Sequence, residues 1–129
     1  MNTGHDGSLS TGHANSTEDM LSRLETMVLQ GASGLPLEAI RQQIASAVDI
    51  IIHLSRLRDK TRKTMEICEV VGYERGNGGE TGRIVLNPLY VFKEDEKSTL
   101  NHVSGALKRT ENKMQNIFKL KLYGYSEVI

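Results

Sequence analysis

The segment at residues 48–54, VDIIIHL, places the strongest constraint on what this chain can fold into. It is β-branched and apolar at consecutive positions, not only at every second one. Successive side chains of a β-strand point to opposite faces of its sheet, so this strand presents apolar side chains to both faces. We therefore predict a buried strand in the interior of a sheet rather than a strand at its edge.

Two more extended segments follow, at residues 64–71 and 84–92. The charged residues 56–63 are expected to form the first turn, and the Gly- and Asn-rich residues 75–82 a hairpin loop. Pro88 lies within the last of these strands and has no N–H to donate to a sheet. That strand is therefore predicted to be interrupted or to lie at an edge.

Three segments show helical spacing of apolar residues: 17–30, 36–47 and 111–123. Ser16 is a suitable N-cap for the first helix, and Asp19 completes an approximate capping box. Pro36 is well placed at the start of the second helix. Residues 94–102 are polar and are predicted to form a loop.

Two helices followed by a meander of strands and a final helix make a mixed α/β pattern without repeated βαβ units. The helices are too few to cover both faces of the sheet. We therefore expect an incomplete sheet that is part of a larger domain. If so, the apolar residues Val48, Ile50, Ile51 and Ile52 should not all be covered within one monomer.

Composition excludes several classes of function. Sixteen basic residues balance sixteen acidic ones, so nothing predicts a nucleic-acid partner. No apolar run approaches the roughly 20 residues of a membrane span, and no secretory signal opens the chain. Cys68 is the only cysteine, which favours a reducing compartment, and no histidine or cysteine pair has zinc spacing. We expect a cytoplasmic protein without a metal site or direct membrane insertion.

The first sixteen residues, MNTGHDGSLSTGHANS, place His5 and His13 among Gly, Ser, Thr and Asn. Such a composition cannot build a core. It suits a backbone that approaches a polar ligand closely, because glycine is conformationally permissive and small hydroxyl groups form hydrogen bonds.

Specific stretches then carry a family resemblance. After the opening segment come SRLETM at residues 22–27, AIRQQIASA at 39–47, SRLRD at 55–59 and EVVG at 69–72. In this order they resemble the type II/IV secretion ATPases, and most closely the CpaF-type branch that drives Tad pilus assembly. The opening segment is similar to the histidine box of that family.

The resemblance implies a homo-hexameric motor that hydrolyses ATP with Mg²⁺. This chain would be the C-terminal portion of its RecA-like P-loop NTPase core. Residues 1–16 would form the histidine-box loop or strand, residues 17–124 the rest of the domain portion, and residues 125–129 a tail. Neighbouring subunits and inner-membrane pilus or secretion platform proteins are the implied partners. The implied site contains His13 and His5 as the catalytic candidates, with Gly7, Ser8, Thr11, Asn15 and Arg23 binding or sensing the nucleotide.

The sequence departs from the family pattern in one important respect. It contains no G-x-x-x-x-G-K-[ST] loop, and the glycine cluster at residues 76–82 lacks the Gly-Lys-Ser/Thr ending and leads into a strand. The family's magnesium-binding strand would precede Met1. A truncated gene, an internal start or a deliberately shortened protein would each give such a chain. We expect neither ATP hydrolysis nor tight nucleotide binding by this chain alone.

Several residues have a simpler interpretation. His53 alternates within an apolar strand, and Cys68 has no activating neighbour in sequence, so both are predicted to be structural. The basic residues between Arg56 and Lys63 are interpreted as a solvated turn or a subunit contact, since no aromatic residues are interleaved with them. The alternative function is a non-catalytic α/β module that binds a pilus or secretion motor component.

Overall fold

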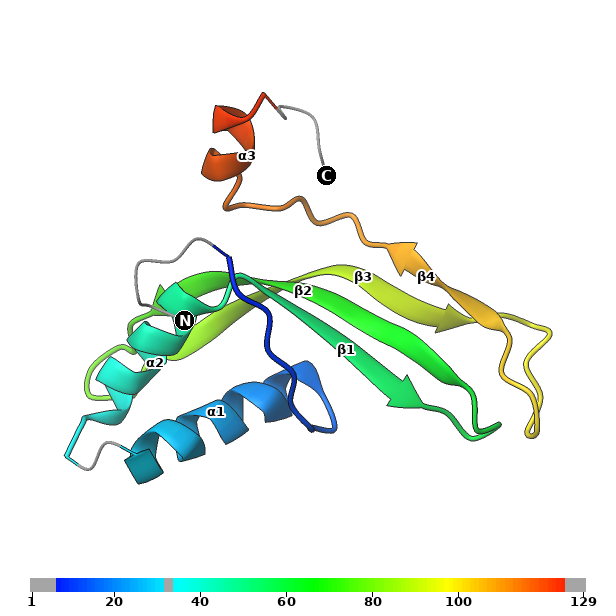
Figure 1. Cartoon of the computed structure of the whole chain (residues 1–129), viewed down its shortest axis with the longest axis horizontal. Coiled ribbons are helices and arrows are strands. Elements are labelled where there is room, and N and C mark those ends of the chain that lie inside the picture. Colours follow the sequence, from blue (N-terminus) through cyan, green and yellow to red (C-terminus); the bar gives the residue numbers. More distant parts are fainter. Residues whose placement is uncertain (1–6, 32–33, 125–129) are drawn as a thin grey trace.

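The computed structural model describes residues 7–31 and 34–124 (Figure 1). The predictions for residues 1–6 and for the tail at 125–129 lie outside the described residues. The elements are α1 (Thr17–Gly31), α2 (Leu37–Ala47), β1 (Ile50–Arg56), β2 (Arg62–Glu74), β3 (Arg83–Glu94), β4 (Gly105–Arg109) and α3 (Phe118–Leu122).

The strands form one open sheet in the order β1-β2-β3-β4, and every neighbouring pair is antiparallel. The predicted meander and the mixed α/β class are confirmed. The turn after β1 and the glycine-rich hairpin loop between β2 and β3 lie where the sequence predicts them. Within the described residues the sheet is open at both edges, as expected of an incomplete sheet.

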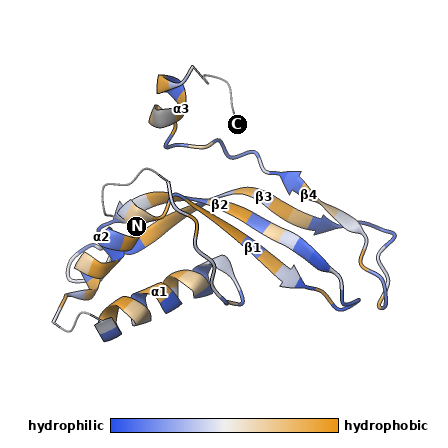
Figure 2. Ribbon diagram, viewed as in Figure 1, coloured by the Kyte–Doolittle hydropathy of each residue, from blue (hydrophilic) through white to orange (hydrophobic). Residues whose placement is uncertain are grey.

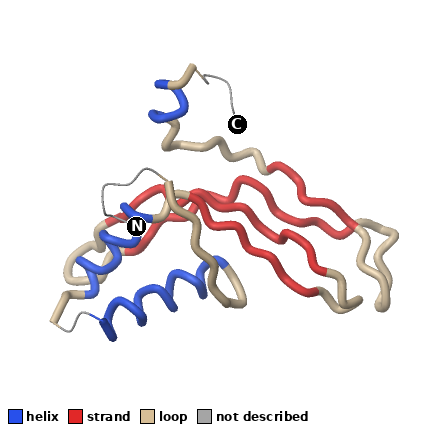
Figure 3. Tube along the Cα trace, viewed as in Figure 1, coloured by secondary structure: helices blue, strands red, loops and turns tan. Residues whose placement is uncertain are grey.

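The core lies where α1 and α2 pack on one face of the sheet, near the start of β1 (Figures 1 and 2). Leu21, Ile40 and Ile44 are buried at its centre. Helical spacing brings Leu24 and Val28 to the same side of α1 as Leu21. The partly buried residues packed against this cluster are Leu24, Val28, Val48, Ile51, Ile84 and Leu86. The strands extend well past the helices, so the core covers only part of the sheet (Figure 3).

The prediction that the VDIIIHL strand lies inside the sheet is wrong for the described residues. β1 is an edge strand, and only β2 pairs with it. Ile51 packs on the core, whereas Ile52 is 55% exposed and Leu54 is 62% exposed. The related prediction is confirmed, because Val48, Ile50, Ile51 and Ile52 are not all covered in one monomer. The apolar face of β1 that points away from the helices (Ile50, Ile52 and Leu54) has no covering layer among the described residues.

The predicted final helix at residues 111–123 is also wrong for most of its length. Helix α3 begins only at Phe118 and contains five residues, and strand β4 before it was not predicted. The backbone N–H groups of Gln115 and Asn116 donate to the carboxylate of Glu69 at 2.8 and 2.7 Å. These N–H groups are therefore directed to a distant side chain rather than to helical carbonyls, and α3 starts after them.

Strand β3 continues through Pro88, with an irregular pairing to β2 between Ile67 and Cys68. The pairing with β4 begins only at Tyr90, so Pro88 lies where β3 has no neighbouring strand on that side. The side chain of Thr110 donates to the Pro88 carbonyl at 2.7 Å, and the Thr110 N–H donates to the Leu89 carbonyl at 2.8 Å. The prediction that this strand is interrupted or lies at an edge is wrong, because β3 runs unbroken from Arg83 to Glu94 between β2 and β4. The sheet accommodates the proline because the pairing with β4 does not reach Pro88.

Candidate functional site

The segment predicted to contact a ligand precedes α1 and has no regular secondary structure between residues 7 and 14 (Figure 1). Its candidate side chains, Ser8, Thr11, His13 and Asn15, are exposed, and Gly7 is exposed with them. None of the side chains of Ser8, Thr11 and His13 forms a hydrogen bond or ion pair with another described residue. His5 lies outside the described residues. The segment therefore presents a row of hydrogen-bonding groups to solvent.

The end of this segment is attached to α1 by a capping arrangement. The Asp19 N–H donates to Ser16 Oγ at 3.0 Å, as the predicted capping box requires. The Asp19 carboxylate then accepts the Asn15 N–H at 2.9 Å, one residue earlier than the usual partner. Both bonds fix the direction in which the segment leaves the helix.

Arg23 meets the same carboxylate. Its Nε lies 3.3 Å from Asp19 Oδ2, one helical turn away, while its side chain stays largely exposed. The Asn15 N–H and the Arg23 guanidinium together hold the pKa of Asp19 below its ordinary value. The structure thus brings Asn15 and Arg23 together through Asp19, a residue that the sequence indicated only as a helix cap.

Gly12 passes close to α1 at Met20. A side chain built on Gly12 would place its first carbon 2.8 Å from the end of the Met20 side chain. The Met20 side chain on α1 therefore packs against the backbone of the exposed segment at Gly12.

A pocket with a volume of about 380 Å³ lies elsewhere, between α1 and the start of β3. Arg41 is at its wall: Arg41 Nε lies 2.7 Å from Glu25 Oε1, and Arg41 Nη1 donates to the Gly82 carbonyl at 2.6 Å. None of the predicted site residues lines this pocket. The arrangement ties α1, α2 and β3 together and leaves no free cation for a ligand at Arg41.

The sequence matches the family described as type II/IV secretion system protein over residues 1–128. The chain belongs to this family.

Individual relatives are similar over shorter stretches. A candidate conjugal transfer protein of Mycobacterium tuberculosis, Rv3659c, is 37% identical over 53% of this chain and 19% of its own length. The conjugal transfer protein TrbB of Rhizobium radiobacter is 32% identical over 59% of the chain and 22% of its own. VirB11 of Brucella suis, a type IV secretion system protein, is 43% identical over 40% of the chain and 15% of its own. The chain thus spans about a fifth of the length of these relatives.

Among the described residues, the glycine-rich loop at residues 75–82 does not have the setting of a phosphate-cradling loop. The glycine-rich loop joins two antiparallel strands, β2 and β3, whereas a phosphate-cradling loop leads from a strand into a helix. Among the described residues, no group of three or more His, Cys, Asp or Glu side chains could hold a metal ion.

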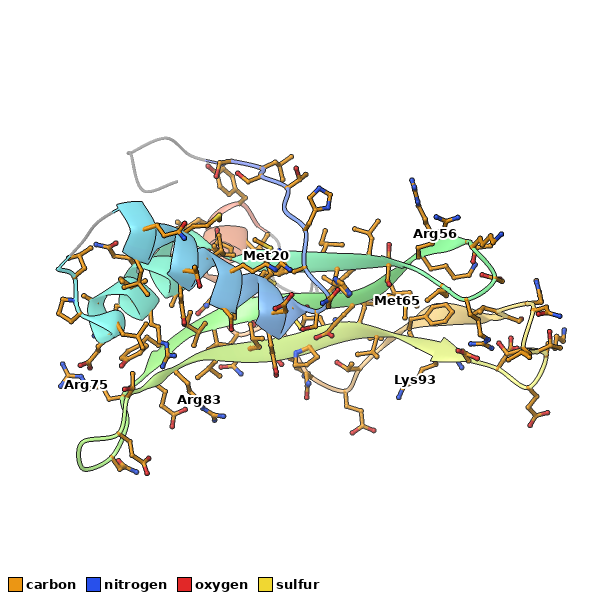
Figure 4. The ribbon with its side chains drawn as sticks, turned by 90° about the horizontal axis from the view of Figure 1, so that it is seen from below. Met20, Arg56, Met65, Arg75, Arg83 and Lys93 are labelled. Atoms are coloured by element: carbon orange, nitrogen blue, oxygen red, sulfur yellow. The ribbon has the colours of Figure 1, made fainter. Side chains whose placement is uncertain are left out.

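One arginine of the basic turn between β1 and β2 forms hydrogen bonds within the chain. Arg58 forms two bonds to the Glu94 carboxylate, at 2.8 and 2.9 Å, and also donates to the Thr99 carbonyl. Arg56 and Lys93 lie toward this end of the sheet, and Arg75 and Arg83 lie toward the other (Figure 4). The basic side chains are thus distributed along the sheet rather than gathered in one patch.

Cys68 is fully buried, and its Sγ donates to the Glu66 carboxylate. Burial, with the adjacent carboxylate, raises the pKa of the thiol to about 12. A thiol held protonated is a poor nucleophile, in keeping with the predicted structural role.

Within residues 7–31 and 34–124, no helix has the length and apolar character required to cross a membrane.

Proposed function

We propose that this chain is a portion of a type II/IV secretion ATPase of the CpaF type, in which ATP hydrolysis drives Tad pilus assembly or protein secretion. The observation that carries the proposal is the row of exposed donors before α1, within a chain that matches the secretion family along almost its whole length. In this proposal the chain supplies the histidine box near the γ-phosphate and does not hydrolyse ATP by itself.

His13 is the proposed sensor of the nucleotide state, with His5 beside it in the box. Catalysis of phosphoryl transfer depends on positioned donors around the charge on the phosphate oxygens, and an imidazole N–H is such a donor. Ser8, Thr11 and Asn15 would contribute further hydrogen bonds, and Gly7 would allow close approach of the backbone. The capping bonds to Asp19 support this role, because they fix where the end of the donor row lies.

The apolar face and free edge of β1 support the proposal that further strands complete the sheet. Ile52 and Leu54 point away from the helices and have no cover among the described residues. A strand that is apolar on both faces is stable when it is covered on both. The proposed additional strands would bring the phosphate-cradling loop that this chain lacks.

We place the proposed motor in the cytoplasm, as a homo-hexamer beneath inner-membrane platform proteins. Arg23 would then face the seam with the neighbouring subunit. Its side chain is 55% exposed beside Asp19, which supports contact with an anionic group of the neighbouring subunit.

A first experiment measures ATP turnover and ATP binding by the purified 129-residue chain. We expect turnover at background and binding that is at most weak. Clear turnover that is lost in His13→Ala would contradict the proposal that the remaining catalytic parts lie elsewhere.

A second experiment reads the genomic frame directly upstream. An in-frame phosphate-cradling loop and magnesium-binding strand are expected. An unrelated upstream reading frame would contradict the motor proposal. It would favour the alternative, a non-catalytic module that binds a motor or pilus component through the free β1 edge.

A further inference from the structure

Glu69 is a buried carboxylate to which the proposed function assigns no role. It lies on β2, on the face of the sheet opposite to α1 and α2, and is only 1% exposed. No cation pairs with it among the described residues. Hydrogen bonds stabilise its charge instead. The carboxylate is therefore coupled to the groups that donate those bonds.

Those donors come mainly from one segment far away in sequence, residues 113–117, which we call the C-terminal strap. The N–H groups of Gln115 and Asn116 donate to the two oxygens of Glu69. Asn87 on β3 donates to Glu69 Oε1 at 3.1 Å and to the Lys113 carbonyl at 2.9 Å. The Asn116 side chain returns a bond to the Val71 carbonyl at 3.0 Å.

The strap contributes two partly buried apolar side chains, Met114 and Ile117, but none to the hydrophobic core cluster. The residues at the centre of the hydrophobic core lie on the other face of the sheet and include none from the strap. Beyond the strap, Phe118 and Leu122 of α3 are largely exposed, and no other element of the described chain packs extensively against α3. The strap and α3 lie across the sheet from α1 (Figure 1). The polar contacts that hold the strap on the sheet are centred on one carboxylate, that of Glu69.

We propose that Glu69 is a charge-dependent clasp: its ionised carboxylate holds the C-terminal strap and α3 on the sheet, and loss of that charge releases them while the sheet and the α1–α2 core stay folded. A neutral carboxyl group accepts hydrogen bonds less strongly than a carboxylate and carries a proton that meets the donating N–H groups. The release frees the strap without breaking any bond between strands.

The sign of the pH dependence follows from the surroundings of Glu69. The groups that face it are Ile50 on β1, Asn87 on β3 and the backbone of Gln115 and Asn116, none of which titrates. Burial alone raises the pKa of Glu69, and the donated hydrogen bonds more than reverse this, so its pKa lies below the ordinary value of 4.5. The docking contribution is therefore complete above that value and is lost as the pH falls through the lowered pKa.

The test is amide hydrogen exchange, corrected for the intrinsic rate at each pH, in the unmodified chain and in Glu69→Gln. We expect Glu69→Gln to raise exchange at Gln115 and Asn116 by about tenfold or more, with the core amides of β2 and β3 unchanged. The matched control is Glu74→Gln, an exposed carboxylate on the same strand, which should leave the strap protected. Acidification should release the strap in the unmodified chain and have no such effect in Glu69→Gln.

Asn116→Ala gives an independent route if Glu69→Gln does not fold. It leaves the carboxylate in place, removes the return bond to Val71, and should also increase exchange in the strap selectively. The clasp would be disproved if the strap amides and the β2–β3 amides of the unmodified chain showed the same free energy of opening. A folded Glu69→Gln variant whose strap amides stay protected would also disprove it.

Discussion

At the scale of single residues, the Arg41 side chain links α2 to α1 and to the start of β3 at the wall of the pocket. It pairs with Glu25 on α1 and donates to the Gly82 carbonyl before β3, and both side chains of the pair are mostly buried. Removing one member of a partly buried pair leaves the other with unsatisfied hydrogen-bonding groups.

We predict that Arg41→Met lowers the free energy of unfolding by about 1–3 kcal/mol, because Glu25 and the Gly82 carbonyl lose their donors. Urea denaturation followed by circular dichroism measures the change. The control is Arg23→Met, whose pair with Asp19 is largely exposed and should change the free energy of unfolding much less. Equal losses in the two variants would show that the Arg41 contacts have no special weight.

Ser16 fixes the start of α1 and with it the end of the exposed donor row. We predict that Ser16→Ala destabilises the helix start by about 1 kcal/mol, since the Asp19 N–H loses its acceptor. Faster amide exchange in the first turn of α1 would report this loss. Ser22→Ala, an exposed change inside the same helix, should be neutral or slightly stabilising. A first turn that exchanges no faster in Ser16→Ala would contradict the capping role.

At the scale of elements, β1 combines a covered face with an uncovered one. Ile51 packs on the core, and its neighbours Ile50 and Ile52 point the other way. An edge strand with apolar side chains in the open is a site for association with other chains.

We predict that the purified chain self-associates with rising concentration, and that Ile52→Lys suppresses this with little change in the free energy of unfolding. Ile52 is more than half exposed, so a lysine there stays in solvent and its charge opposes strand pairing. Light scattering and size-exclusion chromatography measure the association. Ile51→Lys is the contrasting variant and should unfold the chain. Association that persists unchanged in Ile52→Lys would exclude this face as its cause.

The far end of the sheet is a second element-level feature, where the loop after β1 meets the loop after β3. Asp59 accepts hydrogen bonds from Thr61 Oγ1 at 2.6 Å and from the Val103 N–H at 2.8 Å. These bonds lower the pKa of Asp59 to about 2. Its contribution to loop docking is therefore present above pH 3.8, its ordinary value, and is lost only as the pH falls through about 2.

We predict that the Val103 amide stays protected from exchange down to about pH 3 and loses protection near pH 2. Nuclear magnetic resonance of that amide across the acid range would follow it. In Asp59→Asn the same amide should show no transition at this pH. A transition near pH 4 in the unmodified chain would mean that Asp59 does not hold the two loops together.

At the scale of the whole molecule, the features that the sequence predicted well are local ones. The spacing of Leu21, Leu24 and Val28 within one helix, the Ser16 cap and the glycine-rich hairpin loop each depend on residues a few positions apart. The motifs between residues 22 and 72 also indicated the family, which the match along residues 1–128 confirms. For the candidate site, the sequence indicated the donors themselves. Their roles toward a nucleotide stay predictions.

The features that it missed depend on residues far apart in the chain. The strap takes its shape from Glu69, some 46 positions away, so helical spacing at residues 111–117 could not reveal that its N–H groups are used elsewhere. Strand β4 forms because β3 offers it a partner, and its own five residues carry little strand pattern. Asp19 joins Asn15 to Arg23 only once the helix has formed.

The sequence by itself thus determined the order of the first elements, the family and the chemical character of the exposed segment, because periodicity, caps and motifs are read within a few residues. Only the tertiary structure decided which side of β1 is covered, where the last helix begins and which carboxylate holds the C-terminal strap. The physical reason is that burial and hydrogen bonding between distant residues depend on which surfaces meet, and spacing along one segment does not specify that.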